Sequence, residues 1–327
     1  MKKFINNVVD IEREMLEGLA MARPDIIRKV GDKNIIVRAN LNPNKIALVS
    51  GGGAGHEPAH AGYVGYGMLD CAISGNIFTS PSAGNILKGI LEVATDKGVL
   101  CIVKNYTGDV LNFNTAVDMA RSKGISIDMV VVNDDISVTE NLVGRRGVAG
   151  TVLVHKIAGA AAESGLSLDS VKRIAQHTID NVRTIGVAIS PCTVPAVGKP
   201  GFDIPDSEME FGIGIHGEPG FSRELMTSAD GIARKMLEKL LSHIDYAAGD
   251  VVVIVNGMGA TPFMELFIIN RFVNTYLYRN GVKIHDTIVG NYMTSIDMAG
   301  VSITILKLDD ELRAFYDAQA ETFAFKK

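Results

Sequence analysis

Apolar and polar positions follow two periodicities along the chain. Residues 8–22 place their apolar side chains three and four positions apart, which predicts an amphipathic helix. Short apolar runs predict buried strands at residues 46–50, 99–104, 127–132, 250–256 and 301–307. Helical periodicity predicts further helices at residues 114–123, 148–164, 167–180, 227–243 and 262–280. This alternation of strands and helices predicts a largely parallel sheet with crossover helices.

Residues 190–220 interrupt this pattern and indicate a division of the chain. They contain five of the ten prolines and several glycines, so they are too irregular for a helix and too apolar for a plain linker. Loops of this length inside compact proteins are usually functional. We place a domain boundary near residues 181–190 and expect two similar α/β lobes, over residues 1–185 and 186–327.

Composition and charge exclude several classes of protein. Hydrophobic residues make up 47% of the 327 residues and charged residues 21%, which is typical of a globular protein and excludes disorder as the main state. The net charge of -5 implies no basic face, so we expect no direct binding to nucleic acid. No apolar run approaches the roughly 18 residues that span a bilayer, and the N-terminus lacks the apolar core of a signal peptide. We therefore expect a cytoplasmic protein that binds no membrane.

The three cysteines agree with a reducing compartment. Cys71, Cys101 and Cys192 are odd in number and widely spaced, so they form neither a disulfide framework nor a metal-binding pair. We expect each of them to pack as a small residue of the hydrophobic core.

The first candidate for chemistry is the glycine-rich segment at residues 50–58, which reads SGGGAGHEP. Glycines between a strand and a helix allow the backbone close to a ligand, and their N–H groups can converge on oxygen atoms. The segment matches neither the P-loop nor the dinucleotide-binding fingerprint, and a tight structural turn also explains its glycines. His56 directly after them favours a site. His60 follows four residues later, a spacing that would place both histidines on one face of a helix, where they can bind a metal ion. Pro58 and the lack of a third ligand disfavour this interpretation.

The second candidate is residues 104–109, which follow the predicted strand at residues 99–104. Ligands bind beyond the carboxyl ends of the strands in open α/β sheets. Asp109 can act there as a base or as an acceptor for a substrate hydroxyl. An Asx turn or a helix N-cap is the alternative explanation for an aspartate at this position.

The third candidate is His216, in the glycine-rich residues 211–220. A neutral imidazole nitrogen is a nucleophile, and a carbonyl carbon is a suitable target. The flanking glycines leave the ring clear of neighbouring side chains, although a strand-edge histidine in a glycine-rich turn is the alternative. We expect the remaining histidines to be satisfied surface or core groups; these are His155, His177, His243 and His285.

Two adjacent arginines precede the predicted helix at residues 148–164. Arg145 and Arg146 can bind phosphate, but such a pair at a helix start more often forms ion pairs. Residues 133–135, which read Asn-Asp-Asp, offer either an acidic partner or a set of metal ligands. We favour the ion pair.

Taken together, these segments resemble a known family. The sequences SGGGAGHEPAHAGYVG, KNYTGDVLNF, GRRGVAGT and EFGIGIHGEPG closely resemble DhaK, the dihydroxyacetone-binding subunit of dihydroxyacetone kinase. The resemblance runs nearly from end to end. It implies a homodimer with a fold of two α/β lobes, each a mixed sheet with flanking helices.

The resemblance also implies a site. In this family dihydroxyacetone is held as a covalent hemiaminal on a histidine, and the matching residue is His216. The histidine and aspartate that handle the substrate hydroxyls match His56 and Asp109, which gives three catalytic residues. The substrate-contacting glycine and lysine match Gly53 and Lys104. No metal or cofactor is implied for this chain, because in bacterial members a separate subunit carries ADP, which a phosphotransferase-system protein rephosphorylates.

One segment departs from the family pattern. Residues 140–147 read ENLVGRRG, whereas members usually carry a longer run with a Tyr-Thr pair before Gly-Arg-Arg-Gly. Intact substrate residues beside a changed loop are expected where binding is kept and docking of the kinase partner is lost. DhaQ-like members bind dihydroxyacetone and act as coactivators of a TetR-like transcription factor. We therefore expect such a sensor, with the substrate-binding subunit of the phosphoenolpyruvate-dependent kinase, working with an ADP-bearing subunit, as the alternative.

Overall fold

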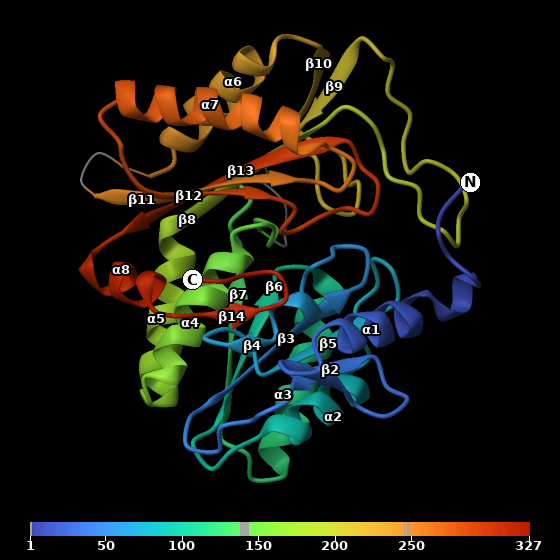
Figure 1. Cartoon of the computed structure of the whole chain (residues 1–327), viewed down its shortest axis with the longest axis vertical. Helices are drawn as coiled ribbons and strands as arrows, with labels where there is room; N and C mark the ends of the chain where they lie inside the picture. The colour runs from blue at the N-terminus through green and yellow to red at the C-terminus, as the bar shows by residue number, and fades with distance from the viewer. Residues whose placement is uncertain (1, 138–143, 245, 247–248) are drawn as a thin grey trace. The chain divides into compact units, whose positions relative to one another are not determined.

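The computed structural model describes residues 2–137, 144–244, 246 and 249–327. The chain forms two compact units, whose helices and strands are labelled in Figure 1. The N-terminal unit comprises Lys2–Val132, Thr151–Thr178 and Leu312–Lys327, and the C-terminal unit comprises Asn133–Gly150 and Ile179–Glu311.

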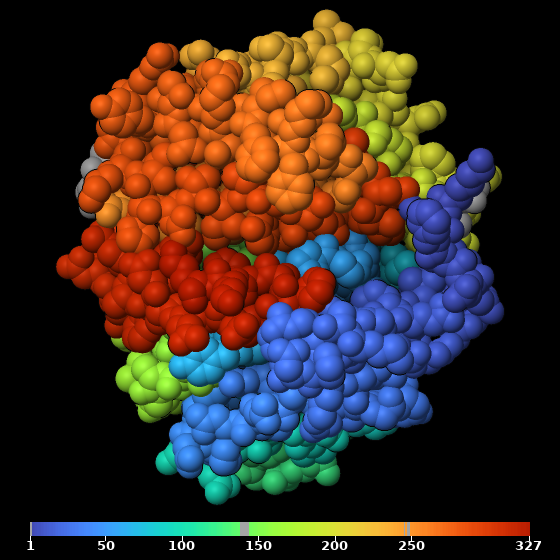
Figure 2. All heavy atoms as spheres, in the orientation of Figure 1, coloured from blue at the N-terminus to red at the C-terminus, as the bar shows by residue number. Residues whose placement is uncertain are grey.

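The C-terminal tail of the chain completes the N-terminal unit. Strand β14 (Glu321–Thr322) pairs antiparallel with β4 (Gly65–Tyr66), and Arg23 forms an ion pair of 3.7 Å with Glu321. Figure 2 shows the tail on the surface of this unit, beside N-terminal residues. The expected division into residues 1–185 and 186–327 therefore differs from the packing of the chain, because pairing between distant residues leaves no local periodicity.

A six-stranded mixed sheet forms the centre of the N-terminal unit, with strand order β1-β2-β5-β3-β6-β7. Its strands are β1 (Ile27–Lys29), β2 (Ile35–Arg38), β3 (Ala47–Gly53), β5 (Cys71–Gly75), β6 (Val99–Lys104) and β7 (Ile127–Val132). β5, β3, β6 and β7 run parallel, and β2 and then β1 join one edge through antiparallel pairings. The carboxyl ends of β3 and β6 therefore meet at one end of the sheet, where the first two candidate segments begin.

Helices cover both faces of this sheet. α2 (Ala83–Val93) and α3 (Thr107–Ser122) bury their apolar sides on one face, in a cluster that includes Val49 and Val103. α4 (Thr151–Glu163), which is buried along almost its whole length, packs on β3 and β6. The other helical elements that belong wholly or partly to this unit are η1 (Val8–Asp10), α1 (Ile11–Ala22), η2 (Ala61–Tyr63), α5 (Leu168–Asn181) and α8 (Asp310–Asp317).

The C-terminal unit contains a second six-stranded sheet, with strand order β10-β9-β8-β13-β11-β12. Its strands are β8 (Val182–Ala188), β9 (Glu208–Phe211), β10 (Ser222–Leu225), β11 (Asp250–Gly257), β12 (Lys283–Gly290) and β13 (Gly300–Leu308). β11 and β12 pair in parallel, and the other pairings are antiparallel. The expected fold class, two α/β lobes that each hold a mixed sheet, is confirmed.

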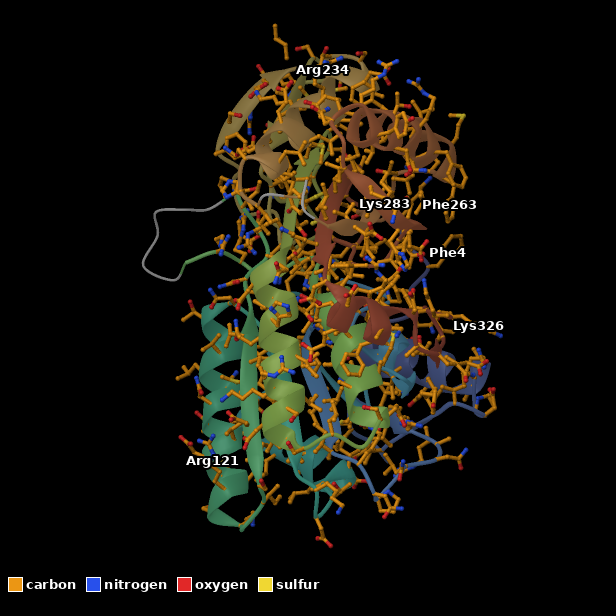
Figure 3. All side chains as sticks on the ribbon, turned by 90° about the vertical axis from the view of Figure 1, so that its left-hand side faces the viewer. Phe4, Arg121, Arg234, Phe263, Lys283 and Lys326 are labelled. Carbon is orange, nitrogen blue, oxygen red and sulfur yellow. The ribbon has the colours of Figure 1, made fainter. Side chains whose placement is uncertain are left out.

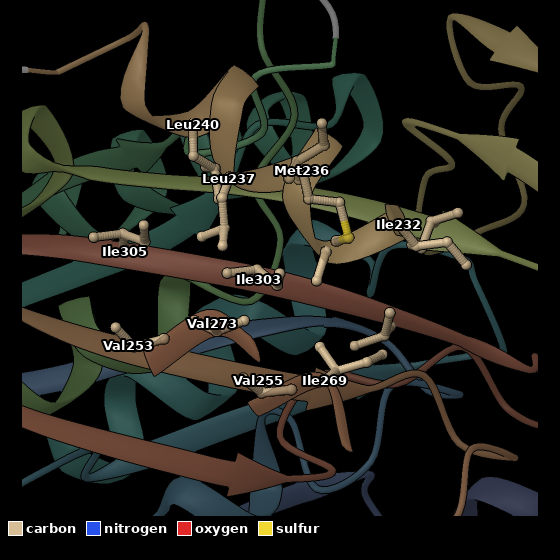
Figure 4. Packing of buried hydrophobic residues seen from close by; sticks show 14 of the residues in the cluster. Ile232, Met236, Leu237, Leu240, Val253, Val255, Ile269, Val273, Ile303 and Ile305 are labelled. Atoms are coloured by element: carbon tan, nitrogen blue, oxygen red, sulfur yellow. The ribbon is translucent and has the colours of Figure 1, made fainter. Parts of the chain in front are cut away.

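Two helices, α6 (Ala229–Leu241) and α7 (Phe263–Arg279), pack on one face of the second sheet. Ile232, Met236 and Leu240 recur every four residues on α6, so they lie on one side of the helix. Figure 4 shows this side packed against Ile303 and Ile305 of β13. Burial of each such side chain contributes about 1.5–3 kcal/mol, so apolar packing holds α6 on the sheet.

Many charged side chains are exposed on both units. Figure 3 shows Arg121 and Lys326 at the outline of the N-terminal unit and Arg234 at the outline of the C-terminal unit. Within the described ranges, none of the helices is both long enough and apolar enough to cross a bilayer.

Residues 51–53 lie inside β3 and not in a loop after it. A β-carbon on Gly51 would lie 2.4 Å from the carbonyl oxygen of Ile73, on the parallel neighbour β5. A side chain cannot approach a backbone oxygen so closely, so glycine is required for this pairing. The expectation of a glycine loop between a strand and a helix is wrong, because the close approach of two strands, and not a turn, requires the glycine.

Replacement of Gly51 by alanine should destabilise the protein, because the new methyl group would overlap the Ile73 carbonyl. We expect a loss of about 1–3 kcal/mol, seen as a lower Tm in a circular-dichroism melt. Gly84→Ala is the matched control: a β-carbon there meets nothing within 4 Å, and alanine favours the helix α2 by about 1 kcal/mol. A Tm for Gly51→Ala at or above that of the wild type would contradict this explanation.

Candidate functional site

The first candidate segment lies at the carboxyl end of β3, in the N-terminal unit. Gly53 closes the strand, and a β-carbon there would lie 2.8 Å from Phe78 Cα and 2.5 Å from the Thr79 nitrogen. Phe78 has a φ of 57°, which is costly for a bulky side chain. Its ring stacks on the buried His56 imidazole, with the ring centroids 5.0 Å apart. Gly53 thus admits the strained Phe78, which in turn supports the plane of His56.

The second candidate segment joins β6 to α3. Lys104 is the last residue of β6 and is fully buried, and Asp109 lies in the first turn of α3 and is 4% exposed. The partial positive charge of a helix N-terminus favours a carboxylate there. The N-cap of α3 is Tyr106, so Asp109 is not the cap that the alternative explanation required. Buried charged groups are costly, and their presence here indicates a functional constraint.

Three polar side chains lie close to Gly52. A β-carbon on Gly52 would lie 3.5 Å from Asp109 Oδ2, 3.6 Å from Lys104 Cε and 3.6 Å from His60 Nε2. The structure thus brings Lys104 and Asp109 together at the carboxyl end of β3. It adds His60, which sequence reasoning considered only as a metal ligand.

His60 belongs to a buried hydrogen-bonded chain that sequence reasoning missed. Its Nδ1 lies 3.0 Å from His155 Nε2 and 3.3 Å from Ser50 Oγ. The Ser50 hydroxyl donates to the Ile102 carbonyl over 2.7 Å. His155 was expected to be a satisfied surface or core group; it lies in the core, but its Nδ1 has no hydrogen-bond partner among the described residues. A histidine inside the apolar sequence of α4 was the available signal.

Burial keeps both histidines neutral at pH 7. Loss of water is the main cause, and the nearby Lys104 charge adds to it: together they lower the pKa of His155 to about 3 and hold the pKa of His60 well below its usual value. Residues 54–60 form bends and turns, so His56 and His60 do not share a helix face. In the ranges that the structure describes, no group of three His, Cys, Asp or Glu side chains is placed to hold a metal ion.

The third candidate, His216, lies in a turn of the C-terminal unit after β9. The Glu218 carboxylate contacts it twice: Oε1 lies 2.8 Å from His216 Nδ1, and Oε2 accepts from the His216 backbone N–H over 3.0 Å. Because an ionised carboxylate only accepts, Nδ1 carries a proton, and in the neutral form of the ring the lone pair is therefore on Nε2. Burial raises the pKa of Glu218, but the hydrogen bond and charge of His216, with a smaller effect from Arg146, bring it down to about 2.

Arg146 supports the turn that carries His216. Its guanidinium pairs with Asp135 at 2.7 Å and donates to the Gly212 carbonyl over 2.7 Å. A β-carbon on Gly214 would overlap the Glu218 carboxylate and lie 2.6 Å from Arg146 Nη1, so glycine is required where these groups approach. The predicted ion pair between the two arginines and residues 133–135 is confirmed for Arg146.

The neighbouring Asp134 has a structural role. It is fully buried and accepts hydrogen bonds from the backbone N–H groups of Val148 and Gly150, over 2.8 and 2.7 Å, and from the Thr184 hydroxyl. These bonds hold Asp134, Val148 and Gly150 to β8, within the C-terminal unit. Residues 140–143, where the chain departs from the family pattern, lie outside the described residues.

The candidate residues thus form two chemically different groups. Gly53, His56, Lys104 and Asp109 lie in the N-terminal unit and offer buried hydrogen-bond donors and acceptors. His216 lies in the C-terminal unit, partly exposed, and offers a nucleophilic nitrogen. The first group can bind the hydroxyls of a small polar ligand, and the second can add to a carbonyl carbon.

Comparison with known proteins places the chain among close relatives. The family model described as the Dak1 domain matches residues 17–324. The chain is 52% identical over 314 residues, 95% of each chain, to the PTS-dependent dihydroxyacetone kinase 1, dihydroxyacetone-binding subunit DhaK of Listeria innocua. It is 50% identical to the corresponding Lactococcus lactis subunit, over 95% of this chain and 94% of that protein. A solved structure named dihydroxyacetone kinase operon co-activator Dha-DhaQ matches with a TM-score of 0.91 at 38% identity, over 95% of this chain and 97% of that chain.

Acid should destabilise the protein through its buried neutral histidines. A histidine in the unfolded chain titrates near pH 6.5, whereas the folded-state pKa of His155 is about 3. Below pH 6.5 the unfolded chain therefore binds more protons, and the folded state loses about 2 kcal/mol at pH 5 through His155 alone. The free energy of unfolding of His155→Gln, measured in urea, should fall less between pH 7 and pH 5 than that of the wild type.

His285→Gln is the control for this measurement. His285 lies on the edge strand β12 and is only half-buried, so this variant should follow the wild-type pH dependence. Equal losses of stability in the wild type and His155→Gln would show that His155 is not held neutral.

Proposed function

The chain belongs to the Dak1 family, and from that premise we propose that it binds dihydroxyacetone as a covalent hemiaminal on His216. The observation that carries the proposal is the 2.8 Å contact between His216 Nδ1 and Glu218. A neutral imidazole with its proton on Nδ1 has the lone pair on Nε2 that addition to a ketone needs. Relatives at 52% and 50% identity whose names state dihydroxyacetone binding support this choice of ligand.

In the proposed step the Nε2 lone pair of His216 attacks the carbonyl carbon. A C–N bond forms and the C=O π bond breaks; the oxygen then gains a proton from water, and Nδ1 releases one. Glu218 stabilises the positive charge on the ring between these events, because with a pKa of about 2 it stays ionised. Since a carbonyl carbon is required, a polyol such as glycerol forms no adduct.

We propose that the candidate residues of the N-terminal unit bind the rest of the ligand. His56 and Asp109 hydrogen-bond its hydroxyls, and Lys104 and the backbone of Gly53 contact its oxygens. A ketone this small buries little apolar surface, so its affinity depends on directed polar contacts and on the covalent bond. In phosphate transfer Asp109 accepts the hydroxyl proton, as a buried carboxylate within reach of a substrate can.

We propose that the protein is the dihydroxyacetone-binding subunit of a kinase. The support is its identity of 52% and 50% to two relatives named as such subunits. The kinase subunit is therefore our first candidate, whereas the sequence of residues 140–147 led us to expect the coactivator. Because the sequence contains no nucleotide-binding motif, the phosphate comes from an ADP-bearing partner subunit in this proposal.

The second candidate is a dihydroxyacetone-dependent coactivator of a TetR-like transcription factor. The observation that favours it is the missing Tyr-Thr pair at residues 140–147. Dihydroxyacetone then shifts the protein toward a state that binds the regulator, and the regulator contacts the DNA. In either role we propose a homodimer in the cytoplasm, a reducing compartment that suits three buried free cysteines.

The His216→Ala variant should form no adduct with dihydroxyacetone. Native mass spectrometry of the wild type should show a gain equal to one whole dihydroxyacetone, because a hemiaminal forms without loss of water, and no gain with glycerol. His243→Ala is the matched control, since His243 is exposed just after α6, and it should keep the adduct. An adduct that persists in His216→Ala would assign the covalent bond to another residue.

Reconstitution decides between the two roles. We expect dihydroxyacetone phosphate to form when the protein is mixed with the ADP-bearing subunit of a related kinase, its phosphodonor and dihydroxyacetone. Asp109→Asn should lower kcat by about 100-fold or more and leave the adduct largely intact, because asparagine cannot accept the hydroxyl proton.

Two results would change this assignment. Adduct without turnover, under conditions in which the related binding subunit is active, would favour the coactivator. Unchanged turnover in Asp109→Asn would remove Asp109 from the mechanism.

A further inference from the structure

The buried chain of Ser50, His60 and His155 has a defined arrangement of protons. The Ser50 hydroxyl proton is donated to the Ile102 carbonyl over 2.7 Å, so the Ser50 oxygen can only accept from His60 Nδ1, 3.3 Å away. The proton of the neutral His60 ring therefore lies on Nδ1, where His155 Nε2 also accepts from it over 3.0 Å. His60 Nε2 is left with the lone pair.

This lone pair faces the polar groups around Gly52. His60 Nε2, Asp109 Oδ2 and Lys104 Cε all lie within 3.6 Å of the position that a Gly52 β-carbon would take. The nitrogen is buried and has no hydrogen-bond partner among the residues that the structure describes. A buried acceptor that is left without a donor is costly to the fold, so its retention indicates that a bound molecule supplies the donor.

We propose that His60 is a further ligand-binding residue, whose Nε2 accepts a hydrogen bond from a hydroxyl of the small hydroxyketone bound beside Asp109 and Lys104. The proposal rests on the proposed function and adds to it a residue that neither the glycine-rich motif nor the resemblance assigned. Two acceptor atoms, His60 Nε2 and Asp109 Oδ2, lie near Gly52 beside the side chain of Lys104, and a ligand hydroxyl supplies the donor that such acceptors need.

Neutrality is what makes a histidine suitable at this position. A second carboxylate beside Asp109 would add a like charge to a buried site and would favour its own protonation. A neutral imidazole supplies an acceptor without charge. Ser50 and His155 are then positioning residues, because they keep the proton on the Nδ1 side of the ring.

Two substitutions separate ligand binding from a structural role. The amide of His60→Asn can replace the Nδ1 donor toward Ser50 and His155 but reaches no further, whereas the amide of His60→Gln can place an oxygen near the Nε2 position. We expect calorimetry to show a Kd for dihydroxyacetone roughly tenfold higher in His60→Asn and within about threefold of the wild type in His60→Gln. A structural role predicts the opposite order, which would overturn the proposal.

The Gly52→Ala variant tests whether a ligand hydroxyl binds next to Gly52. A methyl group there meets only ordinary contacts of 3.5–3.6 Å, so the variant should melt at a Tm close to that of the wild type. The same methyl group would crowd a ligand hydroxyl bound beside Asp109 and His60, so the Kd for dihydroxyacetone should rise by roughly tenfold or more. An unchanged Kd would show that this point lies outside the ligand site and would overturn the proposal.

The wild-type protein allows a measurement that does not depend on the folding of a variant. Nitrogen-15 NMR of histidine-labelled protein, assigned with His60→Gln, should show the His60 proton on Nδ1. Saturating dihydroxyacetone should shift the Nε2 signal as that nitrogen accepts a hydrogen bond. An unmoved signal together with a His216 adduct would overturn this inference and leave the proposed function in place. Absence of any adduct in the wild type would overturn both.

Discussion

The chemistry proposed for both units depends on one constraint: a histidine offers a lone pair from Nε2 only when its proton is held on Nδ1. At His216 an ionised carboxylate, Glu218, holds that proton, and at His60 the neutral Ser50 and His155 do so. The charged partner stabilises a ring that becomes positive, which suits a nucleophile. The neutral partners leave an uncharged ring in a buried place, which suits a hydrogen-bond acceptor beside a carboxylate.

Glycines provide the space in which these groups meet. At Gly53 the absence of a side chain admits Phe78 and Thr79 against the strand, and at Gly214 it admits the Glu218 carboxylate beside Arg146. At Gly51 it permits the pairing of two parallel strands. The role of these glycines is therefore to let backbone atoms and a carboxylate come close to the chain. A pattern search that looks for phosphate-binding loops does not detect this use of glycine.

The central strands could be predicted from the sequence, and the hydrogen-bonded partners could not. β6 and β7 coincide with the predicted runs, because strands buried on both faces are apolar throughout. β1 and β10 are short edge strands with charged residues, and such strands resemble loops. An ion pair between the two arginines and residues 133–135 could be predicted because these residues lie close together in the chain, but the structure was needed to identify Arg146 and Asp135 as its members. His60 and His155 are 95 residues apart, so no local pattern joins them, and the roles of the five matched site residues stay predictions.

The pairing of β14 with β4 sets the order in which the chain matures. β4 is made well before its partner β14, because about 250 residues separate the two strands in the chain, so β4 stays without this partner while those residues are made. Every segment of the C-terminal unit has been made by then. The N-terminal unit is thus completed only after the C-terminal unit has been made, and until then its nascent chain presents an unpaired strand edge.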